Sequence, residues 1–270
     1  MGKLQAQGIN AAAITYDSRE VLANFGEAYK IGYPLLSDAG SKVIREFGIF
    51  NTNIPPDHKM MYGIPWPGDY LIAPDGAVRD KWFLPSYEHR PSASEAALRH
   101  FDGDRGNSVR IEAGVVNATV TLSTDRCFPG QELGLLLEVR LEPGWHVYGQ
   151  PLPAQYQAIE LRLESPLIGE QSLELPAAHP LLLKALGETL PVYAGGFKAH
   201  GKVGIKWSPP MPAKFLEPLG NRIEPGLYQI TGTLRFQACG DDICETPQSV
   251  KFELPLTVDA GIPPAPKKTA

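Results

Sequence analysis

The sequence predicts an α/β part followed by an all-β part, and three observations predict it. Strand-like and helix-like segments alternate up to about residue 102, whereas later segments are short, strand-like and separated by turn residues. The 270 residues include 27 glycines and 26 prolines, as expected for a chain with many turns. A polar stretch, FDGDRGNS, separates the two patterns. We predict a first domain over 1–102, a linker over 103–109, a second domain over 110–258 and a disordered tail over 259–270.

Periodicity assigns the elements of the first domain. AAAITYD is a short apolar run, typical of a buried strand. The following segment, DSREVLANFGEAYKI, has Asp17 and Glu20 at capping-box spacing, which predicts a helix. The apolar residues that recur on one face of this helix are Val21, Leu22, Phe25, Ala28 and Tyr29.

The rest of the first domain continues the alternation. YPLLSD is extended, and GSKVIREFGIF has apolar residues at helical spacing. GDYLIAPDGAVRDKWF predicts two strands around a turn at Pro74, Asp75 and Gly76. SASEAALRHF predicts the closing helix of this domain.

The second domain is a series of strands. Its strand-like segments are ATVTLST, LGLLLEVRLE, IELRLES, KVGIKWS, LYQITGTLRFQA and SVKFELPLTV. They show partial two-residue alternation and are separated by turn residues, which predicts an antiparallel sandwich.

Charge and hydropathy exclude several classes of protein. The net charge is −5 and no basic block is present, which argues against a nucleic-acid partner. No apolar run approaches the roughly 20 residues of a membrane helix, so no membrane span is expected. The start, MGKLQAQGINAAAITYD, lacks the apolar core of a signal peptide.

Two of the three cysteines, Cys239 and Cys244, lie in the predicted turn between the last two strands. A hairpin can bring their Cα atoms within about 6 Å, as a disulfide requires. Such a small ring would stabilise the fold by only about 2 kcal/mol, which mildly favours a redox role over a structural one. Zinc usually takes four ligands, and no second cysteine pair exists, so no metal or cofactor is expected. A structural disulfide and a redox-active pair remain as alternatives.

Acidic residues surround this pair: Asp241, Asp242 and Glu245. Negative neighbours disfavour a thiolate and raise the thiol pKa. We therefore expect the pair to be attacked when it is oxidised, and to deliver electrons only inside a docked complex when it is reduced.

Other candidate residues lie outside the cysteine loop. His146 and Tyr148 alternate with Val147 along a strand, so they share a face that could line the cysteine loop. Trp145 is expected in the core. The third cysteine, Cys127, precedes a Pro-Gly turn and is predicted to be an unpaired thiol.

YPLLSDAGSKVIREFGI and GIPWPGDYLIAPDGAV resemble the peroxiredoxin and thioredoxin-like redoxin (AhpC/TSA) family. The resemblance implies a thioredoxin-like domain with a cis proline at Pro67. The family's reactive cysteine begins a helix after the first core strand, whereas the first cysteine here is Cys127. The resemblance therefore implies an incomplete domain that is no peroxidase. Its first core strand and active-site helix would precede Met1, GKLQAQG would end that helix, and the chain would be part of a longer protein.

CFPGQELGLLLEVRLEPGWHVYG and GLYQITGTLRFQACGDDICETPQSVKFELPL resemble the amino-terminal domain of the transmembrane disulfide reductase DsbD, a disulfide-bond corrector domain. This resemblance implies an immunoglobulin-like sandwich located in the periplasm or elsewhere outside the cytoplasm. Cys239 and Cys244 would exchange disulfides there with thioredoxin-like or other redox proteins. A cap loop would lie within LLLKALGETLPVYAGG, whose candidate aromatic residue is Tyr193.

Together these observations predict a thiol–disulfide exchange protein with Cys239 and Cys244 as its redox couple. The alternative is a non-catalytic immunoglobulin-like interaction module with a structural disulfide. The reduction potential of the pair separates the two hypotheses.

Overall fold

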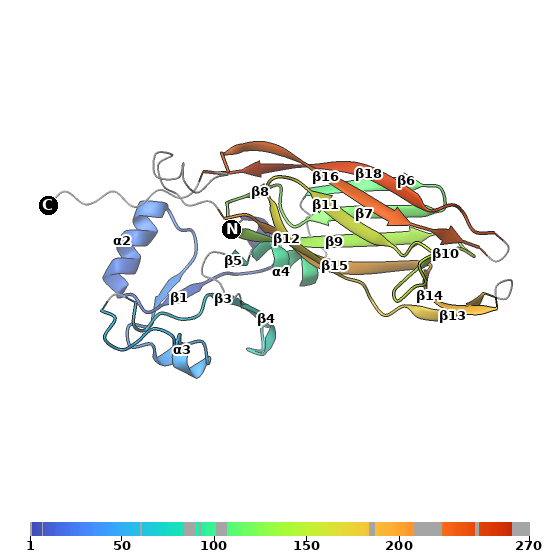
Figure 1. Ribbon diagram of the computed structural model, residues 1–270. Helices are drawn as coiled ribbons and strands as arrows, with labels where there is room; N and C mark the ends of the chain where they lie inside the picture. Colours follow the sequence, from blue (N-terminus) through green and yellow to red (C-terminus); the bar gives the residue numbers. More distant parts are fainter. Residues whose placement is uncertain are drawn as a thin grey trace. The chain divides into compact units, whose positions relative to one another are not determined.

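The computed structural model describes residues 2–6, 8–59, 61–83, 90–91, 93–100, 107–183, 187–207, 223–240 and 243–260 (Figure 1). Backbone contacts divide them into two compact units, one up to Pro91 and one from Ala93 onward. The division falls earlier than the predicted end of the first domain at residue 102. The part of the predicted tail that follows residue 260 lies outside the described residues.

The first unit is mixed α/β. In chain order its elements are α1 (Gly2–Ala6), β1 (Ala13–Thr15), α2 (Arg19–Tyr29), β2 (Leu35–Ser37), α3 (Lys42–Glu46), β3 (Gly68–Ile72), β4 (Val78–Phe83) and β5 (Arg90–Pro91). Strand β1 pairs in parallel with β2, and α2 connects them. Strands β3 and β4 form an antiparallel hairpin whose turn contains Gly76 at φ +85°. Among the described residues, no strand joins these two pairs into one sheet.

Helix α2 begins one residue later than the spacing predicted. Ser18 is its N-cap and accepts a hydrogen bond from the Val21 N–H at 3.3 Å. The Asp17 carboxylate instead accepts a hydrogen bond from the Thr15 hydroxyl. Only Leu22 of the predicted apolar face is buried, whereas Val21 is 51% exposed.

The prediction of a cis proline at Pro67 is wrong. The cis peptide bond of the described residues is Gln150–Pro151, in the second unit. The trans form is favoured at most X–Pro bonds by roughly 0.5–1 kcal/mol. Trp66, which precedes Pro67, is also fixed by a 2.7 Å hydrogen bond from its N–H to the Ile49 carbonyl.

The second unit contains one helix, α4 (Ala93–His100), and is otherwise built from strands in the residues described. These strands are β6 (Asn107–Ala113), β7 (Val116–Leu122), β8 (Arg126–Cys127), β9 (Gln131–Leu141), β10 (His146–Tyr148), β11 (Glu160–Glu164), β12 (Ile168–Glu174), β13 (His179–Leu183), β14 (Glu188–Ala194), β15 (Gly196–Ile205), β16 (Gly226–Phe236), β17 (Ala238–Cys239) and β18 (Gln248–Val258). The predicted linker therefore ends too late, because β6 already begins at Asn107.

The described strands of this unit form three sheets. Their strand orders are β12-β15-β9-β7-β6, β11-β16-β18-β8 and β13-β14-β10-β17. The first two share one core, to which β9 contributes Leu137, β16 contributes Leu234 and β18 contributes Leu254. Each fully buried leucine stabilises the fold by roughly 1.5–3 kcal/mol relative to an exposed one. This core holds the sheet that carries the cysteines in place.

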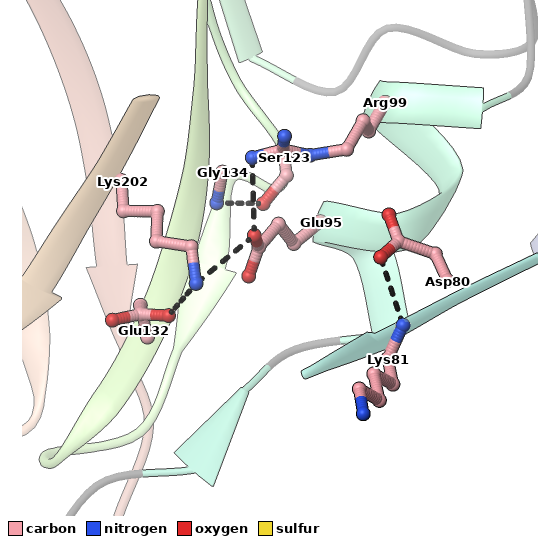
Figure 2. A network of polar contacts seen from close by, with 8 residues as sticks. All are labelled: Asp80, Lys81, Glu95, Arg99, Ser123, Glu132, Gly134 and Lys202. Atoms are coloured by element: carbon pink, nitrogen blue, oxygen red, sulfur yellow. Dashed lines mark hydrogen bonds and ion pairs between the residues drawn. The ribbon is translucent and has the colours of Figure 1, made fainter. Parts of the chain in front are cut away.

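Helix α4 belongs to the second unit because it packs on β9 (Figure 2). Gly134 leaves room for the helix, since an added Cβ would lie 3.2 Å from the Cα of Glu95. The Glu95 side chain is buried and lies 3.4 Å from the Lys202 ammonium, which also bonds Glu132 at 2.8 Å. Burial raises the pKa of Glu95, although Lys202 opposes the shift. The helical pattern of residues 92–101 carries no sign of this attachment.

Candidate functional site: an asymmetric disulfide

The cysteines lie where the chain passes from one sheet to another. Strands β16 and β18 form a long hairpin in which Phe236 pairs with Gln248. Between them the chain leaves this sheet, and Cys239 pairs with His146 of β10. Gln237 fixes the crossing point, because its amide donates to the Glu245 carbonyl at 3.1 Å and accepts from the Gln157 N–H at 3.2 Å. The cysteine loop is therefore anchored to two sheets.

Cys239 and Cys244 form a disulfide, and their Cα atoms are 4.1 Å apart. Two backbone hydrogen bonds close the loop independently of the sulfurs. The Glu245 N–H donates to the Ala238 carbonyl at 2.9 Å, and the Gly240 N–H donates to the Ile243 carbonyl at 2.8 Å. The hairpin geometry expected from the sequence is thus present in the structure.

The two halves of the disulfide differ in access to solvent. Cys239 is completely buried, whereas Cys244 is exposed. The Tyr148 hydroxyl lies 3.1 Å from the Cys239 sulfur and 3.6 Å from the Cys244 sulfur. Burial raises the pKa of Tyr148, and Tyr156 and Glu188 raise it further. The hydroxyl therefore stays protonated at neutral pH and can donate a hydrogen bond to a sulfur anion.

An apolar and aromatic cluster surrounds the buried sulfur. Tyr148, Leu190, Val192 and Cys239 form its buried centre, against which Leu152, Tyr156 and Leu183 pack. Strands β13 and β14 supply Leu183, Leu190 and Val192, and they lie in the same sheet as β10 and β17. The segment predicted to hold a cap loop, residues 181–196, forms this hairpin, except for residues 184–186, which lie outside the described part.

The structure brings His146 and Tyr148 to the cysteines. They share one face of β10, and their rings are 5.8 Å apart. His146 is buried directly across from Cys239. The face predicted from their alternation with Val147 is therefore the face that carries the disulfide.

Tyr193 is not part of this site, contrary to the prediction. It pairs with Val147, so its side chain points to the opposite face of the sheet from Tyr148. Its ring stacks on Phe197 at 4.5 Å in the main core, and its hydroxyl donates to the Pro176 carbonyl. The register between β10 and β14 decides this placement.

Of the three acidic residues predicted near the cysteines, the structure describes Glu245. Glu245 follows Cys244 directly, and its carboxylate accepts a hydrogen bond from the Gln248 amide at 2.8 Å. Asp241 and Asp242 lie outside the described residues.

Sequence reasoning missed Tyr156, Glu188 and Gln237. The Tyr156 ring lies 5.2 Å from that of Tyr148, and its hydroxyl donates to Glu188 at 3.1 Å. Tyr156 lies in a turn-rich segment without periodicity, so no pattern indicates its direction. Only its position in the fold reveals its contact with the site.

Cys127 is a free thiol and takes no part in the disulfide. It is buried in β8, and burial raises the pKa of its thiol to about 12. No group of three histidine, cysteine or acidic residues gathers as a metal site in the part of the chain that the structure describes. Within that part, no helix is long and apolar enough to cross a bilayer.

Residues 1–81 match the AhpC/TSA family. This agrees with the redoxin resemblance of the first unit. The matched region contains no cysteine, because the first cysteine of the chain is Cys127. A search of curated proteins found no match.

The solved structures that are similar to this chain include two amino-terminal domains. The N-terminal periplasmic domain of ScsB from Proteus mirabilis is 14% identical, with a TM-score of 0.39. The match covers 57% of this chain and 51% of that one, so this chain spans about half of that structure's length. The N-terminal domain of DsbD from Neisseria meningitidis, in its reduced form, is 15% identical, with a TM-score of 0.26. That match covers 44% of this chain and 74% of the other.

Proposed function

We propose that this protein exchanges disulfides with other proteins through Cys239 and Cys244, passing electrons between a thioredoxin-like partner and protein disulfides. The observation that carries the proposal is the asymmetry of the bond. One sulfur belongs to an exposed residue, and the other is buried beside a tyrosine hydroxyl at 3.1 Å. A purely structural disulfide needs neither feature.

The proposed reaction begins at the exposed residue. A partner thiolate attacks the sulfur of Cys244, forming a mixed disulfide and breaking the Cys239–Cys244 bond. The electron pair passes to the Cys239 sulfur, where the Tyr148 hydroxyl donates a hydrogen bond. A second thiolate of the partner then attacks the mixed disulfide, so that the partner leaves oxidised and this protein is left reduced. The reduced pair passes its electrons to a protein disulfide by the same steps in reverse.

The proposal also includes an architecture for each unit and a location for the protein. The first unit would be a thioredoxin-like domain, and the second an immunoglobulin-like sandwich. The protein would work in the periplasm, where disulfides persist.

The reduction potential of the pair tests the proposal. We expect a value above about −300 mV, measured in dithiothreitol redox buffers with alkylation and mass spectrometry. The Cys127→Ser variant is the control and should leave the value unchanged, since Cys127 is buried away from the pair. A potential well below that limit would instead favour the non-catalytic interaction module with a structural disulfide.

A further inference from the structure

Two glutamates, Glu188 and Glu245, lie near the disulfide. Glu188 is joined to it through a chain of contacts: Tyr156 donates to Glu188 at 3.1 Å, and the rings of Tyr156 and Tyr148 are 5.2 Å apart. Glu245 is the residue that follows Cys244. Within the described part of the chain, neither glutamate forms an ion pair with a lysine or arginine. The Glu188 carboxylate accepts a hydrogen bond from Tyr156, and the Glu245 carboxylate accepts one from Gln248.

The charge of Glu188 acts on the Tyr148 hydroxyl, which lies beside the disulfide. Glu188 contributes to the raised pKa of Tyr148, whose hydroxyl touches the Cys239 sulfur. The attacking thiolate is itself an anion, and the residue that it attacks, Cys244, is followed directly by Glu245. Like charges raise the energy of that approach, whereas a cation carried beside the thiolate lowers it.

We propose that Glu188 and Glu245 select the thiols that exchange with Cys239–Cys244. They favour partner cysteines flanked by lysine or arginine and slow the attack of anionic thiols. This inference rests on the proposed function and adds to it the kind of partner surface that fits the site. The chemical step is unchanged: the incoming thiolate bonds the Cys244 sulfur, and the electron pair of the broken bond passes to Cys239.

Small thiols of different charge test this selection on the full chain. The probes are cysteamine (cationic), 2-mercaptoethanol (neutral) and mercaptoacetate (anionic). Reduction of the disulfide is followed by alkylation and mass spectrometry, and each rate is expressed per concentration of thiolate. Wild type is compared with the double variant Glu188→Gln and Glu245→Gln, which keeps the size of both side chains. Glu253→Gln is the control, because Glu253 is exposed at a distant position of β18.

We expect the ratio of the cysteamine rate to the mercaptoacetate rate to fall about threefold or more in the double variant. The control should keep the wild-type ratio, and 0.5 M salt should reduce the wild-type ratio because salt screens exposed charges. Comparing ratios removes the intrinsic reactivity of each thiol. An unchanged ratio would overturn the charge selection and leave disulfide exchange standing. If none of the three thiols reduced the bond in the folded chain, the proposed function itself would fail.

Discussion

Tyr148 connects the disulfide to the rest of the fold at the scale of one residue. Its hydroxyl is the polar group seen within 3.1 Å of the buried sulfur, and its ring lies in the cluster with Leu190 and Val192. Because burial and nearby negative groups raise its pKa, it acts as a hydrogen-bond donor and not as a base at neutral pH. A donor at this position stabilises the sulfur anion that forms when the bond opens.

Replacing Tyr148 by phenylalanine should therefore slow the opening of the disulfide. Hydrogen bonds to charged groups contribute roughly 1.5–3 kcal/mol, so the rate of reduction by dithiothreitol should fall by about tenfold or more. Tyr193→Phe is the matched control, because Tyr193 lies on the opposite face of the same sheet. Equal rates for wild type and Tyr148→Phe would show that the hydroxyl does not assist the leaving sulfur.

Glu95 is a second residue whose environment has a measurable effect. Burial raises its pKa in the folded chain, so between its ordinary and its raised pKa the folded state binds more protons than the unfolded state. The free energy of unfolding contributed by this group therefore rises as the pH falls through that window, and it is lowest above the raised pKa.

The Glu95→Gln variant should remove this dependence on pH. The difference in unfolding free energy between wild type and variant, from urea titrations at several pH values, should shift in favour of wild type as the pH falls from 7 towards 5. At pH 7 the variant should lose no more than about 1 kcal/mol, since the amide keeps the shape of the side chain. A difference that is constant with pH would mean that Glu95 titrates normally in the fold.

At the scale of elements, the sequence predicts the strands and turns that depend on a local pattern. It does not predict features that depend on strand register or on the element against which a segment packs. The alternation in LYQITGTLRFQA and SVKFELPLTV predicts the long strands β16 and β18, which pair along their full length. The turn at Gly76 follows from the turn-forming residues Pro74, Asp75 and Gly76, of which Gly76 adopts a positive φ. These features need no knowledge of the rest of the chain.

The site shows the same boundary between what is local and what is not. Spacing places Cys239 and Cys244 at a turn, and alternation places His146 and Tyr148 on one face. The prediction that Tyr193 lies at the site is wrong because its face depends on which residue of β10 it pairs with. The sequence places helix α4 in the first domain because helical spacing does not reveal that Glu95 docks beside Gly134.

At the scale of the whole molecule, most of the buried core belongs to the second unit. The reactivity of Cys127 can measure how often this unit opens. When the disulfide is intact, Cys127 is the only free thiol among the three cysteines. It is buried in β8, and its neighbour Arg126 pairs with Asp259. Its reaction with reagents therefore requires the second unit to open.

Labelling of Cys127 by iodoacetamide at neutral pH should be at least about a thousandfold slower in the folded chain than in urea. Burial raises its pKa to about 12, which removes most of the thiolate, and opening costs about 5 kcal/mol or more. The labelling rate should rise with urea along the transition seen by circular dichroism of the strands. Rapid labelling without denaturant would mean that β8 is not fixed against β18.

The backbone bonds that close the cysteine loop have a consequence for repeated turnover. The Glu245–Ala238 and Gly240–Ile243 hydrogen bonds do not involve the sulfurs, and Gln237 ties the same loop to its neighbours. After reduction, the two thiols are thus expected to remain neighbours at a high effective concentration. The reduced pair could then form its disulfide again without a conformational search. A mixed disulfide with a partner protein would be short-lived, because the neighbouring thiol would displace the partner unless that cysteine were removed.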